Sequence, residues 1–79
     1  MHPSLLIAED DGSLRDVLTR SLRAEGFTAT AVATGGELLE HALTDAPDAL
    51  VIDIGLPDAD GRDLCQALRA QGMHAPVLF

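Results

Sequence analysis

Carboxylates stand at or near the ends of two short apolar runs of this chain. Glu9 and Asp10 follow the run Leu5–Ala8, and Asp53 lies within the run Ala49–Ile54. A continuous apolar run of this length is typical of a strand that is covered on both faces of a parallel sheet. An unpaired carboxylate in such a place would lose its hydration without compensation. We therefore expect the two runs to be neighbouring parallel strands whose carboxyl ends bring these side chains into one pocket.

The rest of the chain alternates between helical and extended patterns. Helices are expected at residues 13–25, 37–44 and 62–71, where apolar side chains recur on one face. Further strands are expected at 27–33 and 76–79, the first of them an edge strand because it mixes polar with apolar residues. This order of strands and helices predicts an α/β fold, in which one parallel sheet has right-handed crossovers and helices on both faces.

The composition limits both the core and the partners of the chain. Its 79 residues include two Phe and no Trp or Tyr, so a single domain must build its core from aliphatic side chains. A net charge of −8 argues against nucleic acid or an anionic membrane as a direct partner and favours a metal ion or a basic protein surface. No apolar run approaches the roughly 20 residues that span a bilayer. Because the one cysteine, Cys65, gives no disulfide framework, we expect a cytoplasmic protein.

The carboxylates at the two strand ends predict a metal site with phosphoryl chemistry. In open parallel sheets, ligands bind at the carboxyl ends of the strands, where the direction of the connections switches. With a strand order of 2-1-3-4, Glu9, Asp10 and Asp53 converge on that point. Mg²⁺ fits such a set best, because it takes one or two carboxylates, keeps several waters and completes its shell with phosphate oxygens. A carboxylate there can also attack phosphorus and form an acyl phosphate.

Four segments of the chain resemble a known family. They are Leu5–Asp11, Gly26-Phe27, Ala33–Gly36 and Val51–Gly61. Together they look like the receiver domain of two-component response regulators, over the whole chain. The specific part is an acidic doublet after the first strand combined with Asp-x-x-x-Pro-x-x-x-Gly after the third. The resemblance implies a flavodoxin-like (CheY-like) doubly wound parallel sheet with strand order 2-1-3-4-(5).

The resemblance also implies a role for each matching residue of the site. Asp53 matches the aspartate that a histidine kinase phosphorylates, and Asp10 matches the direct Mg²⁺ ligand of the doublet. Glu9 matches the carboxylate that holds the water shell of the ion, and the carbonyl of Gly55 matches a main-chain ligand. The expected metal set is therefore Glu9, Asp10, Asp53 and Gly55, with Asp53 as the residue that reacts.

Other residues near the motifs are expected to serve the structure. Pro57 and Gly61 match the residues that shape the loop after the third strand. Asp11 is expected to cap the first helix. Asp58 and Asp60 are expected to be solvated charges on that loop.

Two residues of the family's switch have no counterpart in the chain. Receivers carry a Ser or Thr at the end of the fourth strand and a Lys at the end of the fifth, and this sequence contains no Lys. We therefore expect residues 1–79 to be a receiver domain that is incomplete at its C-terminus, without the fifth strand and the last two helices. Such a sheet is expected to expose apolar surface beside the first helix and to self-associate or lose stability.

The function implied by the resemblance is phosphorelay signal transduction. A sensor histidine kinase, in contact with the first helix near Val17 and Leu18, would donate a phosphoryl group to Asp53. The chain would not be an enzyme, but a phosphoacceptor that assists its own phosphotransfer and dephosphorylation. DNA would be contacted only through an output domain of the parent protein, which would regulate transcription. A homodimer is a further expected partner, and a membrane is not.

Two other functions are open at this point. A degenerate receiver would act only as a protein-interaction module, and the intact set of Glu9, Asp10 and Asp53 argues against it. A Mg²⁺-dependent phosphatase that forms an aspartyl phosphate would need a second Asp two residues after its nucleophile. This chain has Gly55 at that position, which argues against the phosphatase.

Overall fold

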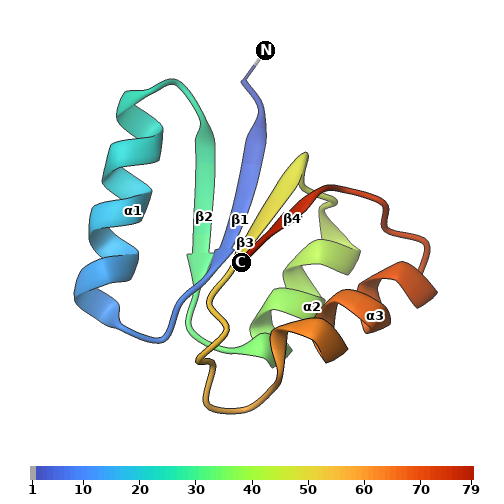
Figure 1. The fold of residues 1–79 in the computed structure, drawn as a ribbon. Coiled ribbons are helices and arrows are strands. Elements are labelled where there is room, and N and C mark those ends of the chain that lie inside the picture. The colour runs from blue at the N-terminus through green and yellow to red at the C-terminus, as the bar shows by residue number, and fades with distance from the viewer. Residues whose placement is uncertain (1) are drawn as a thin grey trace.

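A computed structural model describes residues 2–79; Met1, the first residue of the expected domain, lies outside the described residues. Strands and helices alternate strictly along the chain (Figure 1). The elements are β1 (Ser4–Ala8), α1 (Gly12–Ala24), β2 (Thr28–Val32), α2 (Gly35–Thr44), β3 (Ala49–Ile52), α3 (Gly61–Ala70) and β4 (Val77–Leu78).

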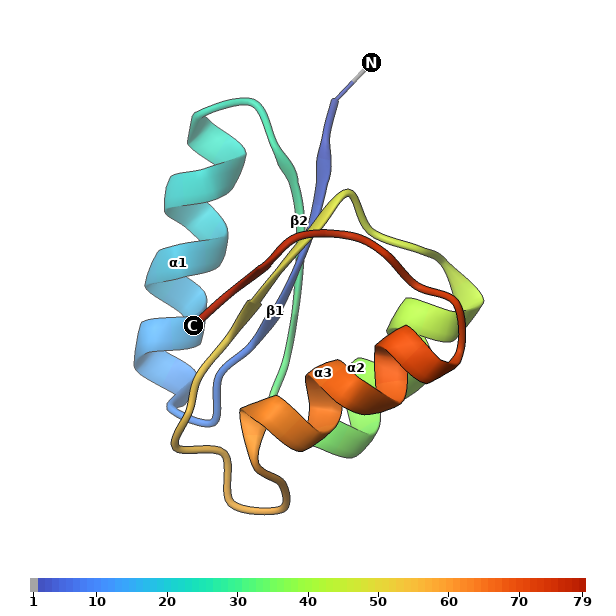
Figure 2. The same cartoon turned by 45° about the vertical axis from the view of Figure 1, so that its right-hand side comes forward.

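The four strands form one parallel sheet with the order β2-β1-β3-β4. Helix α1 covers one face of this sheet, and α2 and α3 lie side by side on the other, so the molecule has three layers (Figure 2). The predicted α/β fold, its strand order and the edge position of β2 are confirmed. Because β1 and β3 are the two central strands, their carboxyl ends lie next to each other.

Most of the core lies between the sheet and the pair α2 and α3. Successive strand residues point to opposite faces, and one alternate set from the strands packs with the inner faces of these two helices. This cluster of buried side chains contains Leu6, Ala8, Val32, Leu38, Ala42, Leu50, Ile52, Leu56, Leu64, Leu68 and Met73. It is aliphatic throughout, as the composition requires.

The opposite face of the sheet is covered less completely. Ile7 is fully buried there, yet α1 contributes no buried residue, and the side chains of Leu14 and Val17 are 46% and 51% exposed. On the edge strand β4, Leu78 is 62% exposed. Apolar side chains are therefore exposed beside the first helix, as the sequence predicted. Self-association stays a prediction.

Side-chain caps fix where the helices begin. The Asp11 carboxylate accepts hydrogen bonds from the N–H groups of Ser13 (2.9 Å) and Leu14 (3.2 Å), as predicted for a helix cap. Thr34 caps α2, so this helix begins at Gly35, two residues before the predicted start. The helical spacing of Leu38, Leu39, Ala42 and Leu43 predicts that all four point inward; for Leu43 this is wrong, because its side chain is 53% exposed.

The third strand is shorter than predicted. Ladder pairing stops at Ile52, so Asp53 and Ile54 belong to the loop that follows, and the side chain of Ile54 is 74% exposed. Asp53 is therefore the first residue after the strand, and its N–H still donates to the carbonyl of Ala8 (2.9 Å). None of the helices within residues 2–79 is long and apolar enough to cross a membrane.

Candidate metal and phosphoryl-acceptor site

Two backbone hydrogen bonds continue the sheet by one residue beyond the ends of β1 and β3. Ala8 and Ile52 are paired in the parallel register. The N–H of Glu9 donates to the carbonyl of Val32 (3.0 Å), and the N–H of Asp53 donates to the carbonyl of Ala8 (2.9 Å). The two carboxylates therefore start from neighbouring, fixed points of the backbone, as the sequence predicted.

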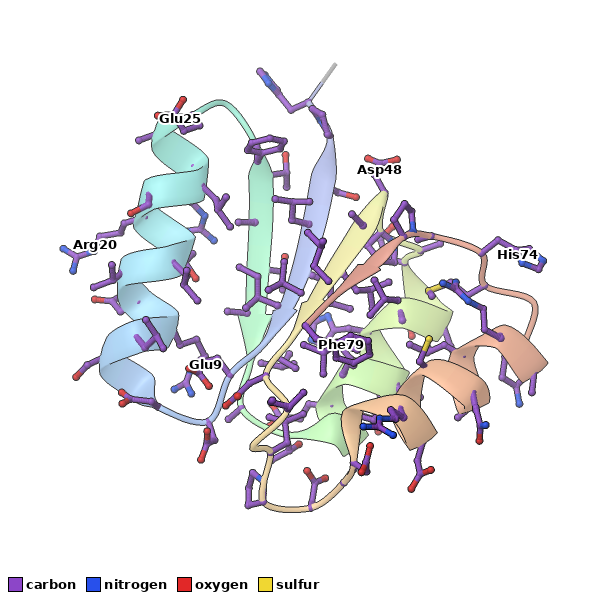
Figure 3. All side chains as sticks on the ribbon, in the orientation of Figure 1. Glu9, Arg20, Glu25, Asp48, His74 and Phe79 are labelled. Carbon is purple, nitrogen blue, oxygen red and sulfur yellow. The ribbon has the colours of Figure 1, made fainter. Side chains whose placement is uncertain are left out.

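The three predicted acidic residues form one cluster. Ligand oxygens of Glu9, Asp10 and Asp53 all lie within 4.8 Å of one another. Glu9 is buried, with 6% of its surface exposed, Asp53 is half-buried and Asp10 is exposed, so the cluster has one closed and one open side. Figure 3 shows Glu9 at the end of β1, on the side of the sheet toward α1. A small hollow of about 150 Å³ adjoins Glu9 and Asp53.

The cluster suits a hard cation. Within the described residues, the Glu9 Oε2 atom is buried and has no hydrogen-bond partner. A buried carboxylate oxygen without a partner is costly, and a divalent ion beside it would remove that cost. Carboxylate oxygens with an open, solvated side match the requirement of Mg²⁺ for few protein ligands and several waters. The donor set that the sequence predicted therefore fits Mg²⁺ in both its chemistry and its placement.

The carboxyl groups of Glu9 and Asp53 titrate as a coupled pair. A hydrogen bond shared with Asp53, burial, and repulsion from Asp53 and Asp10 together raise the pKa of Glu9 from 4.5 to about 7. The same shared hydrogen bond and the N–H of Gly55 lower the pKa of Asp53. Asp53 is thus the member of the pair that keeps its negative charge, which is the state a nucleophile or ligand requires.

Gly55 lies against the side chain of Asp53. Its N–H donates to Asp53 Oδ1 (3.0 Å), and a Cβ at this position would lie 3.6 Å from the same oxygen. The backbone of Gly55 is therefore next to the carboxylate cluster, where a main-chain ligand would have to be. That its carbonyl binds the metal stays a prediction.

Asp58 and Asp60 are exposed on the loop, as predicted, and both also bind N–H groups at helix starts, which was not predicted. Asp60 caps α3 through the N–H of Arg62 (2.7 Å). The two oxygens of Asp58 accept from the N–H groups of Gly35 (2.9 Å) and Gly36 (3.1 Å) at the start of α2. These two bonds lower the pKa of Asp58.

Sequence reasoning also missed Arg15. Its Nη1 donates to the carbonyl of Glu9 (2.9 Å) and lies 3.5 Å from that of Asp10, so α1 holds the backbone of the acidic doublet. Helical periodicity gave no sign of this contact, since it places Arg15 only among the polar positions of α1. Gly61 is buried, and a Cβ there would come within 2.9 Å of the ring of Phe79, which Figure 3 shows at the end of β4. That Gly61 shapes the loop stays a prediction.

The sequence matches a known domain family. The family model described as the response regulator receiver domain matches residues 5–79. The response regulator MprA of Mycobacterium ulcerans (strain Agy99) is 40% identical over 78 residues, which are 99% of this chain and 34% of that protein. The chain thus spans about a third of the length of the curated relatives it matches.

Solved structures of receivers have the same fold. The chemotaxis response regulator CheY4 of Vibrio cholerae superimposes with a TM-score of 0.93 over 98% of this chain and 66% of that one; at 24% identity this likeness concerns the fold alone. The receiver domain of HemR from Leptospira biflexa is 30% identical, with a TM-score of 0.89 over 98% of this chain and 62% of that one.

Proposed function

The chain belongs to the response regulator receiver domain family, and from this membership we propose that Asp53 accepts a phosphoryl group from a sensor histidine kinase in a two-component system. One observation carries the proposal: ligand oxygens of Glu9, Asp10 and Asp53 meet within 4.8 Å at the adjoining ends of two central strands. At this place the Glu9 Oε2 atom is buried without a hydrogen-bond partner among the described residues.

Each residue of the cluster has a distinct task in the proposed transfer. Asp10 and Asp53 would hold Mg²⁺ directly, Glu9 would hold its waters, and the carbonyl of Gly55 would complete the protein ligands. When bound, Mg²⁺ neutralises charge on the transferring phosphoryl group. The hydrogen bond from Gly55 to Asp53 Oδ1 fixes the rotation of the carboxylate.

The proposed step forms an acyl phosphate on Asp53. A carboxylate oxygen of Asp53 attacks phosphorus of the kinase phosphohistidine; the new O–P bond forms as the P–N bond breaks, and the imidazole of the donor leaves with the bonding electron pair. The lowered pKa of Asp53 keeps that oxygen unprotonated. The same residues would also promote the later hydrolysis of the acyl phosphate on Asp53. Because both steps concern the chain's own phosphoryl group, the chain acts as a phosphoacceptor and not as an enzyme.

The partners follow from the same proposal. The kinase would approach α1, where the side chain of Val17 is 51% exposed and that of Leu18 is half-buried. The charge of −8 leaves DNA recognition to a separate output domain of the parent protein, which would regulate transcription in the cytoplasm. Dimerisation of receivers would couple phosphorylation to that output.

The test is the intact mass of the protein before and after incubation with acetyl phosphate and Mg²⁺. We expect a gain of about 80 Da, the mass of one phosphoryl group, that is absent in the Asp53→Asn variant. A folded protein that gains no mass would contradict the proposal and favour a degenerate receiver that only binds partners.

A further inference from the structure

The loop between β3 and α3 is held by few backbone–backbone hydrogen bonds. Residues 57–59 make no backbone–backbone hydrogen bond with any other described residue, and Pro57 has no N–H to donate. This loop nevertheless begins with Asp53 and Gly55, the residues that most need a fixed position. Side chains must therefore hold the loop in place.

Asp58 supplies the bonds that hold it. Its Oδ1 accepts from Gly35 and its Oδ2 from Gly36, so one carboxylate binds two N–H groups that lie 23 and 22 residues away in the sequence. Gly35 and Gly36 are the first residues of α2, where N–H groups have no partner within the helix and a negative charge is favoured. The bonds thus join the loop of the site to a helix of the core layer.

Close packing also holds the β3–α3 loop against the start of α2, on the buried side of the loop. A Cβ on Gly35 would lie 3.0 Å from the Cβ of Ala59 and 3.0 Å from the methyl groups of Leu64. Leu56, between Gly55 and Asp58, is buried in the core cluster. The loop is therefore seated on α2 by close packing on one side and by the Asp58 carboxylate on the other.

We propose that Asp58 is a positioning residue for the phosphoryl-acceptor site, because it holds the β3–α3 loop on the first turn of α2 and thereby keeps the Gly55 backbone beside Asp53. The expected effect of Asp58 on Mg²⁺ binding rests on the proposed function. The placement of the loop by Asp58 concerns the metal-free protein and does not depend on that function. Groups that orient the ligands of a metal typically change its affinity by about 10–100-fold when removed. Asp58 is expected to act in this way without touching the ion.

A matched control separates this role from simple helix capping. Thr34 caps the same end of α2, since its Oγ1 accepts from the N–H of Glu37 (3.2 Å) and donates to the Glu37 carboxylate (3.1 Å). These bonds stay within the start of α2 and do not reach the loop. Thr34→Val therefore weakens the helix start alone, whereas Asp58→Ala weakens it and releases the loop.

The experiment compares both variants with the unaltered protein. We measure the midpoint of thermal unfolding, the Mg²⁺ dissociation constant by calorimetry, and hydrogen exchange at the Gly55 amide without Mg²⁺. Both variants should lower the midpoint. Only Asp58→Ala should weaken Mg²⁺ binding, by about tenfold, and speed exchange at Gly55. Asp58→Asn keeps one acceptor oxygen and should recover part of both losses, and it replaces Asp58→Ala if that variant does not fold.

Two results would overturn the inference. One is an Asp58 variant whose Mg²⁺ affinity and Gly55 exchange match those of the unaltered protein, which would leave Asp58 as a helix cap only. The other is an equal effect of Thr34→Val on both quantities. If the unaltered protein binds no Mg²⁺, the proposed function fails separately, and hydrogen exchange alone then decides the role of Asp58.

Discussion

Glu9 shows at the scale of one residue why the site calls for a cation. It is a buried carboxyl whose Oε2 has no partner within the described residues and whose pKa is raised to about 7. Without metal, Glu9 therefore keeps its proton to a higher pH than a free glutamate does, beside the ionised Asp53. Binding of Mg²⁺ should displace that proton, because the carboxylates around the ion must be ionised.

This proton predicts how Mg²⁺ affinity depends on pH. Above about pH 7 Glu9 is already ionised and affinity should be constant. Below pH 7 the affinity should fall by about tenfold per pH unit, since one proton must leave for each ion bound. Calorimetric titrations between pH 6 and 8 measure this slope. The Glu9→Gln variant cannot release a proton and should show no slope; a wild-type affinity that is flat over this range would disprove the coupling.

The raised pKa of Glu9 also predicts how the free energy of unfolding depends on pH when no Mg²⁺ is present. The folded protein binds the Glu9 proton more tightly than the unfolded chain, whose pKa is near 4.5. Its contribution to stability is therefore full below pH 4.5 and is lost as the pH rises toward 7. Urea unfolding between pH 5 and 8 should show this decline in the wild type and not in Glu9→Gln. Stability that rises over this window would contradict the assignment. The lowered pKa values of Asp53 and Asp58 act in the opposite sense, at lower pH.

At the level of secondary structure, aspartates in the loops bind the N–H groups at the start of each helix. Asp11 caps α1 and Asp60 caps α3, while Asp58 binds the start of α2 from another loop. The cap at Asp11 could be predicted from its neighbours in the sequence. The bonds of Asp58 could not, because their partners are more than 20 residues away and depend on how α2 and the loop are placed.

The cap of α3 should matter for stability and not for the chemistry. Asp60→Ala removes the acceptor for the N–H of Arg62 and should lower the free energy of unfolding by about 1 kcal/mol. Asp60→Ser keeps an acceptor oxygen and should recover most of this loss. Chemical denaturation measures both variants. The mass gain on acetyl phosphate should persist in each, and its loss in Asp60→Ala alone would show that the cap also serves the site.

At the scale of the whole molecule, the sheet is covered unequally. The α2 and α3 side encloses the core cluster, while Leu14 and Val17 on α1 and Leu78 on β4 stay about half or more exposed. Exposed apolar side chains of this size favour association where they gather into a patch. Residues 1–79 studied alone should therefore self-associate or unfold without cooperativity. Sedimentation velocity and thermal unfolding test this, and a monodisperse monomer that unfolds cooperatively would refute it.

The layout of the fold and the place of the site could be predicted from the sequence, because both follow from the order of strands and helices along the chain. Alternating strands and helices require a parallel sheet, and the acidic residues directly after Ala8 and Ile52 had to meet if those strands were neighbours. Contacts that depend on helix rotation could not be predicted. Arg15 reaches the carbonyl of Glu9, and Leu43 turns outward, only because of how each helix packs on the sheet.

Whether Asp53 is the phosphoacceptor can be measured by tryptic mapping of the phosphorylated protein. With no Lys and arginines at 23 and 62, trypsin separates residues 24–62, which contain Asp53, from the peptide with Glu9 and Asp10. After incubation with acetyl phosphate and Mg²⁺, we expect a gain of about 80 Da on residues 24–62, which is absent in Asp53→Asn. A gain on another peptide, or one that persists in Asp53→Asn, would contradict it.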